Sequence, residues 1–305
     1  MSQRKMLRFS AGVLLLLLPW FGGLVCGKLA GKNFSDCKKF FYKKTPPTGF
    51  PDPNHHLQPI CQFYNKDFRF ATLYNRANRA PLYSAYILRG QGQPPGRETW
   101  YYEPQLANSK DKQYMKPFPV DDQNVRESQA MDEDYTAAPL HTRGHLNAAG
   151  HQNTVDDVEA TFTLTNIVPQ RLGSNNVVWG GLENEVLGRL AHCTGEMYVI
   201  TGVMPYENGQ HMINNRVVVP EYMWSAYCCP SYNPNLPELQ RQFFPTHAAV
   251  GRNDPDSNNE IVTKDPNAPE NRRGYDVKQM DLKELEGILR KRFNTEITLF
   301  EGLCK

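Results

Sequence analysis

A short apolar segment at the start of the chain limits how the rest can fold, because it determines the compartment in which the later cysteines fold. Residues Ala11–Val25 are largely apolar, three basic residues precede them, and the small residues Cys26 and Gly27 follow. The stretch is shorter than the roughly 20 residues of a spanning helix, and Pro19 interrupts it. We therefore expect a cleaved secretory signal over residues 1–27, with an uncleaved N-terminal anchor as the alternative.

Six cysteines remain after this cleavage, and an even number in a secreted chain favours up to three disulfides. They are Cys37, Cys61, Cys193, Cys228, Cys229 and Cys304. The sequence leaves the pairing open, although the adjacent Cys228 and Cys229 are expected to bond different partners. No C-x-x-C pair is present, which argues against a zinc site. A glycosylation sequon at Asn33 also fits a secreted chain.

The composition sets two limits on what the chain can be. Hydrophobic residues make up 40% of its 305 residues, which is enough for a sizeable core and excludes a wholly disordered chain. Lys and Arg number 34 against 32 Asp and Glu, which excludes a generally basic nucleic-acid binder. A site for a polyanion must therefore be a local patch. No repeat or linker is evident, so we expect residues 28–305 to form one domain.

Alternating and aromatic runs predict strands, and apolar residues at helical spacing predict two helices. The expected strands are Phe70–Tyr74, Leu82–Leu88, Thr161–Asn166, Tyr198–Val203 and Val217–Tyr222, and the expected helices are Val177–His192 and Asp281–Phe293. Residues 28–60 are expected to form an irregular arm, 90–135 a polar surface excursion and 252–275 a loop. This order of elements indicates an α+β fold with a mixed or antiparallel central sheet and flanking helices.

The residues with the most chemical content begin at His141-Thr142-Arg143-Gly144-His145. An imidazole can act as a general base near neutral pH, and an arginine can hold an anion through paired hydrogen bonds. The glycine between them allows close approach of another part of the chain. Alone, such a run is more often an ordinary turn.

Asn175, Trp179 and Glu183 follow at intervals of four residues, which places them along one side of a helix. Asn175 is expected near the start of that helix, where asparagine is a favoured cap. Without the upstream motif, a capping asparagine, a core tryptophan and a solvated glutamate would explain the stripe.

Taken together, these ordered motifs resemble those of the DNA/RNA non-specific endonuclease family, whose members carry a ββα-metal (His-Me finger) site. The matching runs are R-G-H-L-N at 143–147, A-T-F-T-L-T-N-I-V-P-Q at 160–170, the Asn175, Trp179 and Glu183 spacing, the upstream segments 79–86 and 129–135, and the later strand 198–202. The resemblance covers about residues 60–250. It is strongest to a vertebrate branch of the family.

The resemblance implies that three of these residues carry out the reaction with a metal ion. His145 would be the general base that activates the attacking water. Asn175 would be the direct protein ligand of a hydrated Mg²⁺, with Mn²⁺ as an alternative cofactor, and Glu183 would hydrogen-bond the waters of that ion. Such a set would hydrolyse a phosphodiester bond.

Three further residues would hold the substrate and support the site. Arg143 and Arg79 match residues that hold phosphate oxygens, and Asn166 matches an asparagine that supports the site from behind. No element that reads bases is apparent in the sequence. We therefore expect DNA and/or RNA to bind through the phosphate backbone, with little sequence preference.

One residue departs from the family pattern. Many members have Asp where this chain has Thr142, and loss of that carboxylate would weaken support for the site. The resemblance thus implies a secreted, metal-dependent, sequence-non-specific endonuclease, and the alternative is a secreted pseudo-nuclease that binds nucleic acid or protein. No stable membrane insertion is expected. Such nucleases can dimerise, so a homodimer is one expected assembly.

Overall fold

The structure is a computed structural model that describes residues 33–92, 99–258 and 260–305. The expected signal peptide, residues 1–27, lies outside the described residues. Within the described ranges, no helix is both long enough and apolar enough to cross a membrane.

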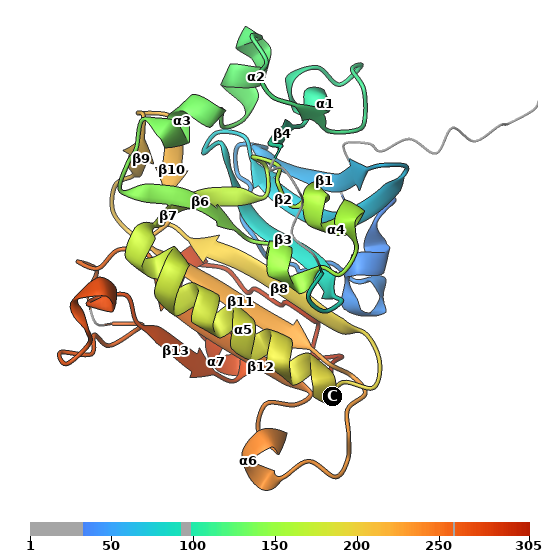
Figure 1. The fold of residues 1–305 in the computed structure, drawn as a ribbon, viewed down its shortest axis with the longest axis vertical. Coiled ribbons are helices and arrows are strands. Elements are labelled where there is room, and N and C mark those ends of the chain that lie inside the picture. Colours follow the sequence, from blue (N-terminus) through green and yellow to red (C-terminus); the bar gives the residue numbers. More distant parts are fainter. Residues whose placement is uncertain (1–32, 93–98, 259) are drawn as a thin grey trace, which may run out of the picture.

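A seven-stranded sheet forms the centre of the molecule (Figure 1), in the order β1-β2-β3-β8-β11-β12-β13. Every neighbouring pair in it is antiparallel. Its strands are β1 (Leu57–Tyr64), β2 (Asp67–Asn75), β3 (Ala80–Leu88), β8 (Met197–Met204), β11 (Tyr222–Cys228), β12 (Thr246–Arg252) and β13 (Val277–Met280). The expected α+β class with an antiparallel central sheet is confirmed.

Three two-stranded pairs and several short helices surround this sheet. The pairs are β4 (Tyr101–Tyr102) with β5 (Lys116–Pro117), β6 (His141–His145) with β7 (Ile167–Arg171), and β9 (His211–Ile213) with β10 (Val217–Val219). The α-helices are α1 (Pro104–Ala107), α2 (Gln123–Ser128), α3 (Asp132–Thr136), α4 (Val155–Ala160), α5 (Gly180–Arg189), α6 (Glu238–Arg241) and α7 (Leu282–Phe293). The other helical turns are η1 (Lys38–Phe40), η2 (Tyr42–Lys44), η3 (Ala149–His151), η4 (Ser174–Trp179, π-helical), η5 (Leu190–His192) and η6 (Glu270–Arg272).

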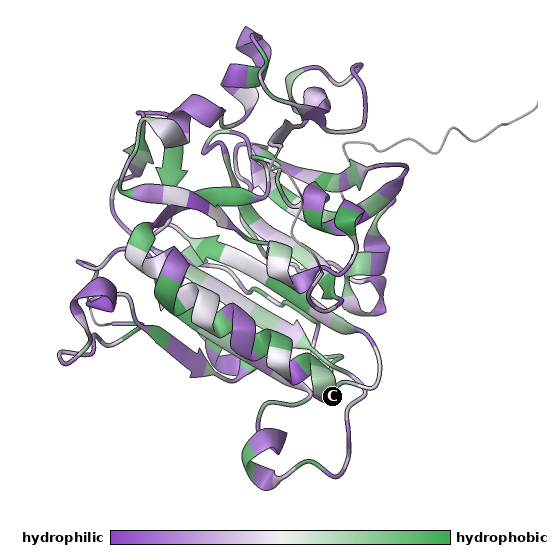
Figure 2. Cartoon of the chain, viewed as in Figure 1, coloured by the Kyte–Doolittle hydropathy of each residue, from purple (hydrophilic) through white to green (hydrophobic). Residues whose placement is uncertain are grey.

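Helix α5 crosses one face of the sheet (Figure 1), and hydrophilic and hydrophobic residues follow one another along it (Figure 2). Leu182 and Val186 are its buried residues. Trp179, just before it, packs so closely on β12 that a Cβ at Gly251 would lie 2.8 Å from the indole ring. A glycine at this position therefore lets the helix settle on the sheet.

Helix α7 covers the opposite face. Trp224 pairs with Val250, the neighbour of Gly251, so its side chain points away from α5. Its ring lies 6.4 Å from that of Phe50, which is 5.5 Å from the ring of Phe293 at the end of α7. Asp281 caps this helix by accepting a hydrogen bond from the Glu284 amide at 2.7 Å, as its sequence position predicts.

The predicted strand Thr161–Asn166 is wrong. These residues form turns and a single bridge, and β7 begins only at Ile167. The threonine hydroxyls bond backbone carbonyls instead: Thr161 donates to Val158 at 2.7 Å and Thr163 to Tyr101 at 3.2 Å. Side chains that compete for backbone groups in this way favour turns over strands.

Two other predictions are corrected in part. The expected strand Val217–Tyr222 is divided between β10 and β11, because Pro220 has no amide hydrogen for a ladder. The excursion over residues 90–135 contains α1, α2 and α3 and buries Leu106, Val125 and Met131. It is thus a packed segment over its described part.

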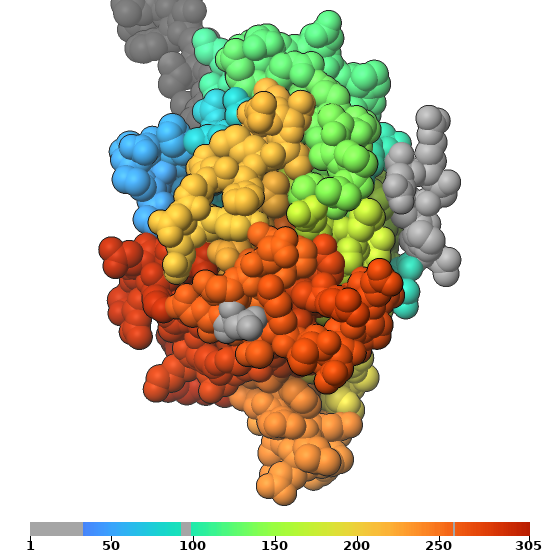
Figure 3. All heavy atoms as spheres, turned by 90° about the vertical axis from the view of Figure 1, so that its left-hand side faces the viewer, coloured from blue at the N-terminus to red at the C-terminus, as the bar shows by residue number. Residues whose placement is uncertain are grey.

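The remaining expected strands and helices are confirmed, whereas the arm expected to be irregular over residues 28–60 runs into β1 at Leu57. Three predicted strands fall within β2, β3 and β8, and the helix predicted at Val177–His192 spans η4, α5 and η5. The loop predicted after Arg252 is irregular except for η6 and forms much of the face seen in Figure 3. Helix α6 projects from the lower end in both views.

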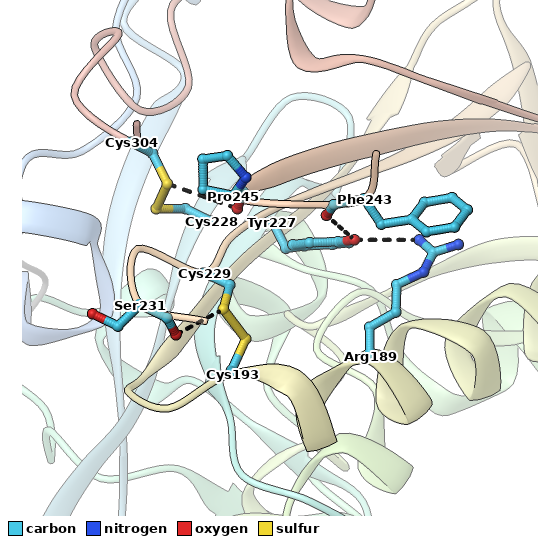
Figure 4. Close-up of a disulfide and its surroundings, with 9 residues drawn as sticks. All are labelled: Arg189, Cys193, Tyr227, Cys228, Cys229, Ser231, Phe243, Pro245 and Cys304. Carbon is cyan, nitrogen blue, oxygen red and sulfur yellow. Dashed lines mark hydrogen bonds between the residues drawn. A yellow bond between two sulfur atoms is a disulfide. The ribbon is translucent and has the colours of Figure 1, made fainter. Parts of the chain in front are cut away.

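All six predicted cysteines form disulfides, in the pairs Cys37–Cys61, Cys193–Cys229 and Cys228–Cys304. The adjacent cysteines at the end of β11 do bond different partners (Figure 4). The Cys193–Cys229 bridge attaches the chain just after η5 to the end of β11. The Cys228–Cys304 bridge attaches the C-terminal segment to the same place. Arg189, at the end of α5, reinforces the first attachment by lying 4.0 Å over the Phe243 ring.

The Cys193–Cys229 bridge closes a loop of 36 residues in sequence separation. Loop-closure entropy for that length predicts a contribution of about 4 kcal/mol to the free energy of unfolding. The double variant Cys193→Ala/Cys229→Ala should therefore unfold at a markedly lower temperature in circular dichroism melting. An unchanged melting temperature would show that this bridge does not hold α5 to the sheet.

Candidate functional site

The candidate site is built on the β6–β7 pair and the helix that follows it. Thr142 pairs with Gln170, Arg143 with Pro169 and His145 with Ile167. Gly144 is required between them, because a Cβ there would lie 2.3 Å from the Gln170 side-chain oxygen. The chain then enters η4 at Ser174 and continues as α5, which gives a strand–strand–helix unit.

Arg143 and His145 share one face of β6, because residues two apart point to the same side of a strand. Both contact Trp100: the Arg143 guanidinium lies 5.2 Å from the indole ring and the His145 ring 5.6 Å from it. Arg143 also pairs with Asp132 of α3 through its Nη2. Its Nε is buried and has no hydrogen-bond partner among the described residues.

The His145 ring lies in an aromatic pocket. The Phe162 ring is 5.1 Å away, on a nearly perpendicular plane. Burial lowers the pKa of His145 to about 4, although a hydrogen bond with the Arg143 backbone opposes the shift. The imidazole is therefore neutral at pH 7. Its Nε2 is buried and finds no partner in the described part of the chain.

The opposite face of β6 carries the contact to the helix. The Thr142 hydroxyl donates its single hydrogen to the Gln170 carbonyl at 3.1 Å. It can then only accept from Asn175, whose Nδ2 lies 2.8 Å away. This arrangement fixes the orientation of the Asn175 amide and turns its Oδ1 away from Thr142.

The alternative in which Asn175 serves as a helix cap is therefore not supported. Its side chain bonds Thr142, and the residue at the cap position is Gly173, whose lack of a side chain gives no cap bond. Asn175 does lie near the helix start, as expected. The π-helical turn over Ser174–Trp179 precedes α5 without a break.

Glu183 lies further along the same helix, beside the loop that follows His145. Its backbone carbonyl accepts a hydrogen bond from His151 Nε2 at 2.9 Å, and His151 Nδ1 lies 2.9 Å from the Tyr86 hydroxyl. Burial raises the pKa of the Glu183 carboxyl to about 7. The helix thus contacts Thr142 of β6 through Asn175 and His151 of η3 through Glu183. No hydrogen bond within the described ranges joins His145 directly to Asn175 or Glu183.

Asn166 is fully buried behind this unit and uses its whole amide. Its Oδ1 accepts from the Ser84 hydroxyl of β3 and from the Asn147 amide, both at 2.9 Å. Its Nδ2 donates to the carbonyls of Asn147 and Thr161, both at 3.0 Å. Asn166 therefore ties the loop after His145 to the central sheet.

Arg79 is placed apart from the His145 face. It lies in the β2–β3 turn, and its Nη1 donates to the Arg216 carbonyl at 3.3 Å. Arg216 pairs with the buried Asp134 of α3 at 2.9 Å. Because the same helix holds Arg143 through Asp132, α3 links the two clusters. Within the described residues, no hydrogen bond joins Arg79 to Arg143 or His145.

The aromatic surroundings of the site are not evident from the sequence. Trp100 and Phe162 contact His145, and Asp132 holds Arg143. Phe162 lies in one of the runs that resemble the family, but the sequence predicts a strand there and not a turn beside His145. The only sequence feature that could have indicated Trp100 is that it is a large aromatic residue in a polar segment.

Comparisons with known proteins identify the family of the chain. The family model of the DNA/RNA non-specific endonucleases matches residues 53–279. The chain belongs to the DNA/RNA non-specific endonuclease family. Members of this family are nucleases, in general metal-dependent.

Two vertebrate relatives are similar over about two thirds of the chain. Human Endonuclease domain-containing 1 protein is 32% identical over 219 residues, which cover 68% of this chain and 42% of that protein. The mouse protein of the same name is 29% identical over 216 residues, covering 65% and 39%. The aligned part thus spans less than half of either relative. The expected likeness to a vertebrate branch of the family is confirmed.

A solved structure also matches in part. A chain of the EndoG/EndoGI complex gives a TM-score of 0.48 at 17% identity, over 79% of this chain and 87% of that chain.

The buried His151 makes stability depend on pH. Burial lowers its pKa to about 4, so the unfolded chain, where a histidine titrates near 6.5, binds the proton more readily. The free energy of unfolding should therefore fall as the pH drops from about 6.5 towards about 4. Between pH 7 and pH 5 this residue should account for a loss of about 2 kcal/mol.

Urea unfolding at both pH values measures this loss. The loss should shrink in His151→Gln, while the exposed control His56→Gln should keep the wild-type value. Equal pH dependence in all three proteins would show that His151 is not responsible.

Proposed function

We propose that the mature protein is a secreted, metal-dependent endonuclease that hydrolyses phosphodiester bonds of DNA and/or RNA without sequence specificity. The observation that carries this proposal is the neutral His145, with an unpaired ring nitrogen, beside Arg143 on the first strand of a strand–strand–helix unit. Family membership supplies the reaction class. In this proposal β6, β7 and α5 correspond to a ββα-metal site.

His145 acts as the general base. A base must be unprotonated and must lie within reach of the attacking water. Burial keeps the pKa of His145 low, and the unpaired Nε2 can accept a proton without breaking an existing bond. Trp100 and Phe162 fix the plane of the ring.

Arg143 holds the phosphodiester. Its guanidinium is a planar donor group suited to phosphate oxygens. Asp132 engages Nη2, while Nε has no partner in the described part of the chain. Stacking on Trp100 keeps the group beside His145. Arg79 donates to the carbonyl of Arg216, which pairs with Asp134 of α3. From there Arg79 would contact a neighbouring phosphate.

The donor chemistry fits a hydrated Mg²⁺ or Mn²⁺. Among the described residues no group of three or more His, Cys, Asp or Glu could hold a metal ion, and Mg²⁺ keeps several waters and needs few protein oxygens. The Asn175 Oδ1 would be the direct ligand, and Glu183 would hold waters of the ion. Once bound, the cation would neutralise charge that develops on the phosphoryl oxygens.

The Thr142 contact weakens the case for an inactive pseudo-nuclease. Its hydroxyl accepts the Asn175 Nδ2–H as a carboxylate would, so the missing aspartate does not leave the amide free to turn. Three disulfides fit an oxidising compartment, which supports secretion. We propose binding through the phosphate backbone; a homodimer stays a prediction.

Removal of the general base tests the proposal. Protein secreted from eukaryotic cells should nick plasmid DNA and degrade total RNA with Mg²⁺ but not with EDTA. His145→Ala should lower the rate by about 10²–10⁴ with folding retained, whereas the exposed control His55→Ala should keep the wild-type rate. Equal cleavage by His145→Ala would assign the base to another residue.

The Thr142 hydroxyl is predicted to set metal affinity through Asn175. Thr142→Val keeps the shape but removes the acceptor, so the Mg²⁺ concentration for half-maximal activity should rise about tenfold or more. Thr142→Ser should restore it. Calorimetric titration with Mn²⁺ should give the same order of affinities without substrate. Identical metal dependence of the valine variant and wild type would contradict this role.

A further inference from the structure

A cavity of about 420 Å³ lies beside the Arg143 and His145 face. Its lining residues come from α3 and from the segments next to β4 and β5; Figure 1 labels β4 and α3. The residues that line it are Thr99, Trp100, Phe118, Pro119, Val120, Met131, Asp132, Glu133 and Thr136. Its size is within the range of small-molecule sites.

The cavity shares two of its lining residues with the surroundings of the proposed catalytic site. Trp100 lines it and contacts both Arg143 and His145. Asp132 lines it as well and pairs with Arg143. A strand whose phosphate lies at Arg143 would therefore bring an adjacent nucleotide to the mouth of the cavity.

The walls suit a flat aromatic ligand. Trp100 and Phe118 are half-buried aromatic side chains, and Phe118 is held 5.3 Å from the Tyr102 ring. Met131 closes the apolar floor and is 1% exposed. Nucleobases stack on aromatic side chains whatever their sequence.

The rim selects against a phosphate and for a base edge rich in N–H donors. Asp132 and Glu133 each use one carboxylate oxygen, towards Arg143 and Arg126 respectively. In the described part of the chain, no hydrogen bond engages the second oxygen of either. A carboxylate only accepts. Guanine presents two adjacent N–H groups to it, whereas uracil and thymine present one N–H between two repelling carbonyl oxygens.

We propose that this cavity binds an unpaired guanine of the substrate strand, next to the phosphodiester that is cleaved. The inference rests on the proposed nuclease function. Because the guanine edge that faces the carboxylates is occupied in a duplex, the cavity favours single-stranded nucleic acid. Contacts elsewhere remain with the phosphate backbone, so the preference is confined to one position.

Sequencing of cleavage ends tests this directly. A random single-stranded DNA library is digested briefly with Mg²⁺, and the base at each position around the cut is counted. Wild type should enrich guanine over thymine about tenfold at one fixed position. Glu133→Gln and Phe118→Ala should lose this enrichment. Glu127→Gln, which removes the same charge from an exposed site on α2, should keep it.

Calorimetric titration without metal separates this inference from the nuclease proposal. Guanosine and uridine 5′-monophosphates carry the same phosphate, so a difference in their affinity reports the base alone. The guanine nucleotide should bind wild type and Glu127→Gln about tenfold more tightly, and Glu133→Gln should lose the difference. Equal affinities, or cleavage with no base enrichment, would overturn the guanine site even in an active nuclease. If the protein binds guanine but cleaves nothing, the nuclease proposal fails and the site stands.

Discussion

The buried amide of Asn166 is the contact on which the arrangement of the site depends. Its side-chain oxygen accepts hydrogen bonds from the Ser84 hydroxyl and the Asn147 backbone amide. Its side-chain nitrogen donates to the Asn147 and Thr161 carbonyls. These four bonds join the central sheet to the loop that leaves His145. Loss of any one of these bonds would leave a buried polar group without a partner. Each such group would lower the free energy of unfolding by about 1–3 kcal/mol. The position of His145 relative to the sheet is therefore held by a fully satisfied polar group and not by apolar packing alone.

The side chains of β6 alternate between its two faces, so the residues of the site are distributed over both faces. Arg143 and His145 point towards Trp100, and Thr142 points towards the helix that carries Asn175. Gly144 keeps the helix-facing side open for the Gln170 side chain. A shift of one residue in the pairing with β7 would exchange the two faces. The register of this short pair thus determines which side chains can act together.

The supports of the site come from segments far apart in the sequence. The Cys193–Cys229 bridge and the Arg189 contact hold the far end of the helix to β11 and its neighbours. The acidic helix α3 holds Arg143 through Asp132. It also holds Arg216, whose carbonyl accepts from Arg79, through Asp134. The sequence shows the cysteine count and the three acidic residues at 132–134. It does not show their partners, because adjacency and charge do not specify which distant residue the folded chain brings close.

The amino-acid sequence alone specifies several local elements and the order of the motifs. Apolar periodicity and Asp281 predicted α7, and aromatic runs predicted β2, β3 and β8, because both signals act within one turn or one strand. It failed at Thr161–Asn166, where hydroxyl groups bond the backbone. Only the tertiary structure placed Trp100 against His145 and the Thr142 hydroxyl against Asn175. The residues in those contacts are far apart in the sequence, and no local periodicity relates them. Their geometry therefore follows from packing and hydrogen bonding in the folded chain.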